Sequence, residues 1–269
     1  MSLWKEGVDQ RRMRTATGLT YYVYGKGHEA VLCHPSLGLG RFLFHRMVPA
    51  LSREFVMVTW DPRGIGDHTE WQPTMSDWVH DVADIVQALN MPVHLLGVSL
   101  GTWVMARAAV QNPSGLVRSL TVIGATLGFY GQEADVSKRQ QQLETNGMAA
   151  FAREYAHNTL TMYASEEIQE NLALELGSCN VQRYLEAMRI IYAESNERIY
   201  PAVSVPTLVM VGALDTRTDA AQADAVCQLL PQGTLKVLPR SGHLALLDQP
   251  DRVHRECRYF WQHGVAADD

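Results

Sequence analysis

A Gly-Val-Ser-Leu-Gly segment at residues 97–101 is the feature that most restricts how this chain folds. It stands between an apolar run, residues 93–96, and a helix-like stretch, residues 103–110. Its two glycines allow a sharp bend without a clash of Cβ atoms, so the segment fits a tight turn from a strand into a helix. Such a turn holds the hydroxyl of Ser99 outside the carboxyl end of the strand. The alternative interpretation is an ordinary glycine-rich loop. Residues elsewhere in the chain are needed to distinguish a strand-to-helix turn from such a loop.

Two further strand-like runs end close to an acid and a histidine. Residues 206–211 lead into Asp215, and residues 234–238 lead into His243. A chain with 29 acidic residues and 10 histidines contains the order Ser, Asp, His many times, so order alone says little. The stronger observation is that Ser99, Asp215 and His243 each follow a predicted strand. We therefore predict that these three residues form a catalytic group.

Strand-like and helix-like stretches alternate from about residue 20 to residue 126, which predicts an α/β protein with a mainly parallel sheet flanked by helices. One intervening helix is indicated by apolar residues at helical spacing from Trp78 to Leu89, with Ser76 in position to cap its start. The strands expected in this part of the chain are residues 21–24, 31–34, 55–60, 93–98 and 120–123.

The strand pattern disappears between residues 127 and 203. Apolar residues from Val181 to Tyr192 fall at helical spacing, and Ser165 followed by two glutamates is typical of a helix start. Two strands then return, and residues 250–262 indicate a closing helix. We predict a core made of residues 1–126 and 204–269, with a helical insertion at residues 127–203.

The chain resembles the α/β-hydrolase superfamily over nearly its whole length. His-Pro-Ser-Leu-Gly at residues 34–38 is similar to the oxyanion loop of that family, and residues 61–66 are similar to its Asp-x-Arg-Gly-x-Gly turn. Residues 36–38 and the middle segment are most similar to 3-oxoadipate enol-lactonases and their close relatives. Two departures are present: Asp67-His68-Thr69 replaces small polar residues, and Thr102 stands where glycine is common. The resemblance implies an α/β-hydrolase fold in which residues 127–203 form a helical cap.

The expected chemistry follows from the weakness of a neutral hydroxyl as a nucleophile. Ser99 needs a base that takes its proton, and an imidazole such as that of His243 changes protonation state near neutral pH. Asp215 is expected to accept the other ring N–H and to stabilise the imidazolium. The backbone N–H of Leu100 and, as the resemblance implies, that of Leu37 are expected to form the oxyanion hole.

The predicted function is that of a cofactor-independent serine hydrolase that cleaves a small carboxylic ester or lactone, with an enol-lactone favoured by the resemblance. Haloalkane dehalogenases and epoxide hydrolases of this fold attack with aspartate, so the serine at position 99 excludes them. A perhydrolase, a C–C bond hydrolase and a ligand receptor without catalysis remain open alternatives on the same three residues. Arginines of the predicted cap could bind a carboxylate of the substrate. The alternative interpretation is that each of these arginines lies on a solvent-exposed helix face. The arginines are Arg139, Arg153, Arg183 and Arg189.

Composition and charge restrict the size of the core and the classes of partner that the protein can bind. The 269 residues, 46% of them apolar, suffice for a sizeable core. A net charge of −6 without a run of basic residues argues against nucleic acid as a partner. No apolar run approaches the roughly 18 residues of a membrane span, and residues 1–14 are polar and charged, so we expect a cytoplasmic protein without a membrane partner. The oligomeric state stays open.

The cysteines and His34 are interpreted as structural residues. The cysteines lie far apart without metal-binding spacing, and no glycine-rich dinucleotide motif is present, so we expect neither a metal nor another cofactor. His34 lies beside the predicted oxyanion loop, and we interpret it as a buried, hydrogen-bonded histidine that shapes the turn. The four cysteines are Cys33, Cys179, Cys227 and Cys257.

Overall fold

The computed structural model describes residues 9–112, 114–129 and 133–267. Within these residues, eight strands form one sheet in the order β1-β2-β4-β3-β5-β6-β7-β8. Strands β3 to β8 run parallel, and β2 runs antiparallel to both of its neighbours. The strands are β1 (Gln10–Arg14), β2 (Thr20–Tyr24), β3 (Ala30–His34), β4 (Val56–Thr59), β5 (Val93–Val98), β6 (Val117–Ile123), β7 (Thr207–Gly212) and β8 (Gly233–Leu238).

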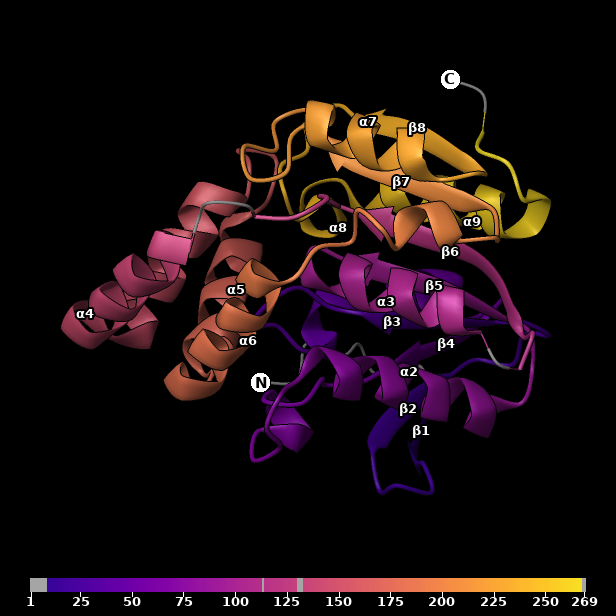
Figure 1. Ribbon diagram of the computed structural model, residues 1–269, viewed down its shortest axis with the longest axis horizontal. Helices are drawn as coiled ribbons and strands as arrows, with labels where there is room; N and C mark the ends of the chain where they lie inside the picture. The colour runs from indigo at the N-terminus through magenta and orange to yellow at the C-terminus, as the bar shows by residue number, and fades with distance from the viewer. Residues whose placement is uncertain (1–8, 113, 130–132, 268–269) are drawn as a thin grey trace.

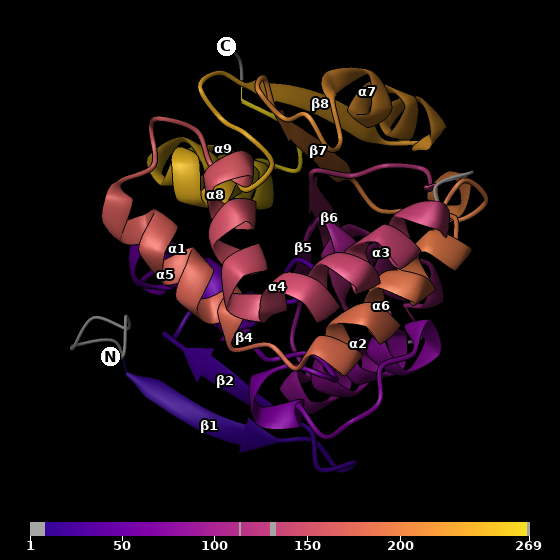
Figure 2. The same cartoon turned by 90° about the vertical axis from the view of Figure 1, so that its left-hand side faces the viewer.

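Helices cover both faces of this sheet. In Figure 2, α2, α3 and α7 lie on one side of the sheet, and α1 and α9 lie on the other. A strand covered on both sides is apolar on both, and successive side chains point to opposite faces, so Val31 and Leu32 of β3 belong to different cores. The helices are α1 (Met47–Leu51), α2 (Met75–Leu89), α3 (Leu100–Gln111), α7 (Ala220–Leu229), α8 (Ala245–Asp248) and α9 (Pro250–His263), with short 3-10 turns η1 (Arg41–Phe44), η2 (Gly66–His68) and η3 (Tyr200–Ala202).

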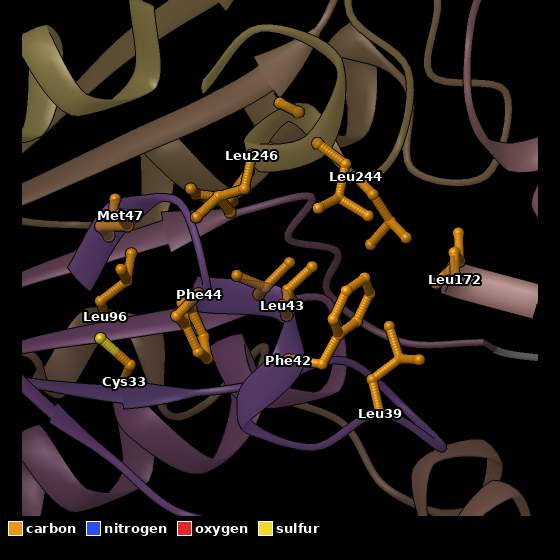
Figure 3. Close-up of a cluster of buried hydrophobic side chains, with 14 of the residues drawn as sticks. Cys33, Leu39, Phe42, Leu43, Phe44, Met47, Leu96, Leu172, Leu244 and Leu246 are labelled. Carbon is orange, nitrogen blue, oxygen red and sulfur yellow. The ribbon is translucent and has the colours of Figure 1, made fainter. Parts of the chain in front are cut away.

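Three further helices, which we call the cap helices, connect β6 to β7. They are α4 (Glu133–Thr159), α5 (Glu166–Gly177) and α6 (Val181–Ala193). They pack on one another at one end of the sheet, on the left in Figure 1 and towards the viewer in Figure 2. A bend in α4 occurs at Gly147, whose φ of 76° and ψ of 164° suit glycine. Apolar cap residues join the core on the α1 and α9 side: Leu172 of α5 belongs to the same cluster as Leu39 and Leu244 (Figure 3).

The sheet flanked by helices confirms the predicted fold class, and each strand expected from the sequence is present. The sequence did not reveal β1, because its side chains are exposed along the whole strand and no apolar alternation marks it. In the described ranges no helix is both long enough and apolar enough to cross a membrane. Nor do His, Cys, Asp and Glu side chains of these ranges gather in groups of three that would fit a metal ion.

The predicted cap of α2 is wrong. The helix begins at Met75, one residue before Ser76, so Ser76 lies inside its first turn. The cap is Thr74, whose hydroxyl accepts a 3.0 Å hydrogen bond from the N–H of Asp77. The cap predicted at Ser165 is confirmed for α5.

Candidate active site

Ser99 occupies the turn between β5 and α3. Its backbone angles, φ 53° and ψ −115°, lie in a region that residues with a side chain rarely adopt. The N–H of Ser99 donates to the carbonyl of Ile123 on β6 at 2.8 Å. The hydroxyl of Thr102 donates to the carbonyl of Ser99 at 2.7 Å, so the residue that replaces the common glycine holds the turn. A serine kept in a strained conformation by its surroundings is typical of functional sites.

The two glycines of this turn are required because other backbone atoms lie too close to leave room for a Cβ atom at either position. A Cβ atom on Gly97 would lie 2.3 Å from the carbonyl oxygen of Gly101, and one on Gly101 would lie 2.3 Å from the carbonyl oxygen of His34. The start of α3 therefore packs directly against the end of β3. Residues 97–101 form the predicted strand-to-helix turn and not an ordinary loop.

Asp215 and His243 form a direct pair. Asp215 follows β7 and His243 follows β8, and the distance from His243 Nδ1 to Asp215 Oδ2 is 2.9 Å. Both residues are buried, with exposed fractions of 6% and 5%. A carboxylate at Nδ1 favours the tautomer with its proton on that nitrogen, which leaves Nε2 able to accept a proton.

Thr218 is a third member of this group, and the sequence did not reveal it. Its hydroxyl donates to Asp215 Oδ2 at 2.8 Å and lies 3.1 Å from His243 Nδ1. The backbone N–H groups of Thr218 and Arg217 donate to Asp215 Oδ1 at 3.0 and 2.8 Å. A threonine three residues after an aspartate is a weak sequence signal, because only the turn after β7 brings the hydroxyl back to the carboxylate.

These contacts set the charge of Asp215. Burial by itself raises the pKa of the carboxyl. The hydrogen bond and the charge of His243, together with the N–H groups of Thr218 and Arg217, lower the pKa by more than burial raises it. The net effect is a pKa below the usual value for aspartate. Asp215 is therefore ionised at neutral pH, as a residue that stabilises an imidazolium must be.

Ser99 and His243 line one cavity of about 90 Å³. Leu37 contributes to its wall from the core, and the cap helices contribute side chains that include Tyr184 and Met188. Within the described residues no hydrogen bond joins Ser99 to His243. Such contacts are often long in free enzymes and shorten when substrate binds.

Leu37 and Leu100, the predicted oxyanion residues, each line a pocket to which Ser99 also contributes. Leu100 is the first residue of α3, where backbone N–H groups have no acceptor within the helix, and it lines a small pocket together with Ser99. Leu37 lines the main cavity. The next residue, Gly38, has a φ of 73°, and a Cβ there would lie 2.8 Å from the ring of Tyr184, so this loop depends on glycine.

The departure at residues 67–69 has a structural explanation. His68 is buried, accepts a 3.0 Å hydrogen bond at Nε2 from the N–H of Thr20 and donates from Nδ1 to the carbonyl of Asp61 at 2.6 Å. Asp67 accepts a 2.6 Å hydrogen bond from the hydroxyl of Tyr22. Both side chains therefore tie the turn after β4 to the start and middle of β2.

His34 is a buried residue with a structural role. Its Nδ1 donates to the carbonyl of Pro35 at 2.9 Å, and the rings of Trp60 and Trp78 lie nearly perpendicular to the imidazole, with ring centres 5.3 and 6.5 Å from its own. Burial lowers the pKa of His34 to about 4, although the bond to Pro35 acts in the opposite direction. The ring is therefore neutral at physiological pH. All four cysteines are free; Cys33 and Cys257 are buried, and Cys179 and Cys227 are half-buried.

Of the four cap arginines named from the sequence, the cavity wall contains only Arg139. Arg183 and Arg189 donate to other groups of the protein, and Arg153 is exposed. The wall contains a second arginine, Arg217, from the loop after β7. The sequence did not reveal it because nothing in the local pattern shows which way that loop turns.

The chain belongs to the alpha/beta hydrolase family, whose model matches residues 30–256. Among characterised relatives, 3-oxoadipate enol-lactonase 1 of Acinetobacter baylyi is 25% identical over 232 residues, which cover 83% of this chain and 85% of that protein. Serine hydrolase BPHL of Mus musculus is 26% identical over 259 residues, which cover 91% of this chain and 83% of that protein.

The fold has close counterparts among solved structures. The crystal structure of the enol-lactonase from Burkholderia xenovorans matches with a TM-score of 0.84 at 18% identity, covering 94% of this chain and 100% of that one. These similarities confirm the resemblance to the α/β-hydrolases and, among them, to the enol-lactonase group.

Proposed function

We propose that this protein is a serine hydrolase of small carboxylic esters and lactones, with enol-lactones as the favoured substrates. One observation carries the proposal: a strained serine and a histidine line the same cavity, and that histidine is bonded to a buried carboxylate. An arrangement of this kind activates a hydroxyl for attack on a carbonyl carbon.

In the proposed acylation, His243 Nε2 takes the proton of the Ser99 hydroxyl as its oxygen bonds to the substrate carbonyl carbon. The carbonyl oxygen becomes an oxyanion that accepts hydrogen bonds from the N–H groups of Leu37 and Leu100. The bond to the leaving oxygen then breaks, and His243 returns the proton to that oxygen. Asp215 holds the ring and stabilises the imidazolium throughout.

In the proposed deacylation, His243 takes a proton from water while the water oxygen attacks the acyl carbon. The bond to Ser99 then breaks, and the proton returns to the serine oxygen. When the substrate is a lactone, its leaving oxygen stays tethered to the acyl group, so the cavity has to hold both ends of the opened product while water reacts.

Cavity size supports a small substrate. Its volume of about 90 Å³ is well below the roughly 300–1,000 Å³ of pockets that enclose drug-sized ligands. The favoured class, enol-lactones, is supported by the 25% identity to the Acinetobacter enol-lactonase across most of both chains. We further propose that residues 127–203 act as a cap that selects the substrate, since cap side chains form much of the cavity wall.

Labelling and turnover test this proposal together. A fluorophosphonate reagent should modify Ser99, as peptide mapping would locate it, and p-nitrophenyl acetate and small lactones should be hydrolysed. Ser99→Ala should abolish both results, while Ser114→Ala, at an exposed serine, should change neither. A label on another serine would refute the nucleophile assignment. Binding of lactones without turnover by the wild-type protein would instead indicate a ligand receptor.

A further inference from the structure

The oxyanion loop, by which we mean residues 34–40, touches the cap at two of its glycines. A Cβ atom on Gly38 would lie 2.7 Å from Cδ1 of Leu176, and one on Gly40 would lie 3.3 Å from Oε1 of Glu175. Glu175 and Leu176 belong to the last turn of α5, and Leu176 is fully buried. The carboxyl end of this cap helix therefore packs directly against the loop.

The loop holds Leu37, whose N–H is a proposed oxyanion donor, inside a tight turn. The N–H of Leu39 donates to the carbonyl of Ser36 at 3.1 Å, so Leu37 and Gly38 are the central residues of a four-residue turn. This turn is attached to β3 on one side and to residues 40 and 41 on the other. Contacts that hold residues 40 and 41 therefore also help to hold the N–H of Leu37 in its direction.

Two carboxylates hold this far end of the loop. Asp61, from the turn after β4, accepts a 2.9 Å hydrogen bond from the N–H of Arg41, and its Oδ2 lies 3.7 Å from Nε of the same arginine. Gly40 is buried, and its N–H has an acceptor in the carboxylate of Glu175. A buried N–H without an acceptor costs free energy. The core thus holds one of two successive N–H groups, and the cap holds the other.

Stability alone does not favour a carboxylate at position 175. Burial and the charge of Asp61 raise the pKa of Glu175, and the N–H of Gly40 and the charge of Arg41 only partly oppose this rise. A negative charge in the last turn of a helix also opposes the helix dipole. Residues that depart from such local preferences are expected at functional positions. The compensating contact of Glu175 is the one with the oxyanion loop.

We propose that Glu175 is a positioning residue for the reaction: it holds the N–H of Gly40 and so fixes the loop that directs the N–H of Leu37 to the oxyanion. The inference rests on the proposed function and adds a role of the cap in the chemical step. The residues that line the cavity around Ser99 do not include Glu175, so it acts through the loop and not on the substrate. A displacement of α5 would therefore also displace an oxyanion donor.

Two esters that differ in a single atom test this role. p-Nitrophenyl acetate places a negative oxygen in the oxyanion hole, and p-nitrophenyl thionoacetate, with C=S in place of C=O, places a larger sulfur there. A well-placed hole favours the oxygen ester, and a displaced hole loses that preference. We expect Glu175→Ala to lower kcat for the oxygen ester by about 10- to 100-fold with little change in KM. The ratio of kcat/KM for the oxygen ester to that for the thiono ester should fall by about tenfold.

Matched variants separate the position of the loop from general effects on the fold. Glutamine keeps an acceptor oxygen for the N–H of Gly40, so Glu175→Gln should retain kcat within about threefold of the wild type. Glu170→Ala, at an exposed glutamate of the same helix, should change neither kcat nor the ratio. Urea unfolding checks that each variant is folded. Glu175→Met, which keeps the volume without the acceptor, replaces the alanine variant if that variant does not fold.

The outcomes separate this inference from the proposed function. Turnover by the wild type together with an unchanged ratio in Glu175→Ala, or an equal loss of kcat in Glu175→Gln, would overturn the positioning role and leave the hydrolase in place. Fluorophosphonate labelling of Ser99 without turnover would refute the hydrolase.

In that case the labelling rate decides, because the phosphonyl oxygen occupies the same hole. A rate that falls by about tenfold or more in Glu175→Ala, and not in Glu175→Gln, would support the positioning role. An unchanged rate would overturn it. Absence of both labelling and turnover in the wild type would overturn both proposals.

Discussion

The carboxylate of Asp248 accepts a 2.7 Å hydrogen bond from the backbone N–H of Gly242, the residue immediately before His243. Its other oxygen accepts two hydrogen bonds from Thr161, one from the N–H at 2.8 Å and one from the hydroxyl at 2.9 Å. Thr161 lies between α4 and α5. One buried carboxylate thus joins the loop that carries the histidine to the cap.

Asp248→Asn should therefore weaken both the fold and turnover. An amide has a single acceptor oxygen, so the N–H of Gly242 or the groups of Thr161 lose their partner. We expect the free energy of unfolding to fall by about 1–3 kcal/mol and kcat to fall by about tenfold or more with KM little changed, because the base is displaced. Urea unfolding and p-nitrophenyl acetate kinetics measure these effects. Asp251→Asn, at an exposed position of α9, is the control, and a loss as large in that variant would count against a positioning role for Asp248.

Replacement of Ser99 by glycine should stabilise the protein relative to replacement by alanine. The φ of 53° at this position is strained for alanine, at a cost of about 1–3 kcal/mol, and open to glycine. Greater freedom of glycine in the unfolded chain offsets about 0.4–1 kcal/mol of that difference. Neither variant should turn over substrate. Equal unfolding midpoints for Ser99→Gly and Ser99→Ala would show that the turn is not strained.

Thr218→Val should reduce turnover less than Asp215→Asn but by a measurable amount. Asparagine at position 215 can present an N–H to the ring and favour the wrong tautomer, so we expect kcat to fall by about 10³- to 10⁴-fold. Valine at position 218 keeps the shape and removes one donor to the carboxylate, and we expect a loss of about tenfold. Thr216→Val, at an exposed threonine of the same loop, should leave kcat unchanged, and the same loss there would refute a specific role for Thr218.

Met188→Ala should change substrate preference more than chemistry. Met188 projects from α6 into the cavity wall, so its truncation makes room for a longer acyl chain. We expect the ratio of kcat/KM for p-nitrophenyl hexanoate to that for the acetate to rise about tenfold. Met162→Ala removes an exposed methionine of the cap and should not alter the ratio. A uniform loss for both esters in Met188→Ala would contradict a selective role for the cap.

Stability should fall between pH 6.5 and 4, in part because of His34. Burial lowers the pKa of His34 from 6.5 to about 4 in the folded protein, so the unfolded chain takes up a proton first as the pH falls. The stabilisation is complete above pH 6.5 and decreases towards pH 4, by about 3 kcal/mol over that window. His254, whose pKa burial also lowers to about 4, adds to the same trend.

Unfolding in urea at several pH values measures this effect. His34→Gln should make the free energy of unfolding depend less steeply on pH in this window, while His28→Gln, at an exposed histidine, should not. An unchanged pH dependence in His34→Gln would show that His34 does not cause it.

The sequence by itself determined strands β2 to β8, several of the helices and the three main residues of the candidate site. Strands buried on both faces have to be apolar, so most of them were visible as short apolar runs. Ser99, Asp215 and His243 each stand just after such a run, and a parallel sheet places the ends of its strands along one edge. The geometry of the 97–101 turn was also local, since it depends on two glycines within five residues.

Only the tertiary structure decided which other side chains meet these three. Asp248 and Thr161 are 87 residues apart in the chain and touch because the cap folds back over the histidine loop. Arg139 was one of several cap arginines, and its place in the cavity wall depends on how α4 bends and packs. Arg217 and Thr218 lie in a loop, where no periodic sequence pattern shows which way a side chain points. Local sequence reports which face of an element is apolar, but the contacts between distant elements depend on packing of the whole chain.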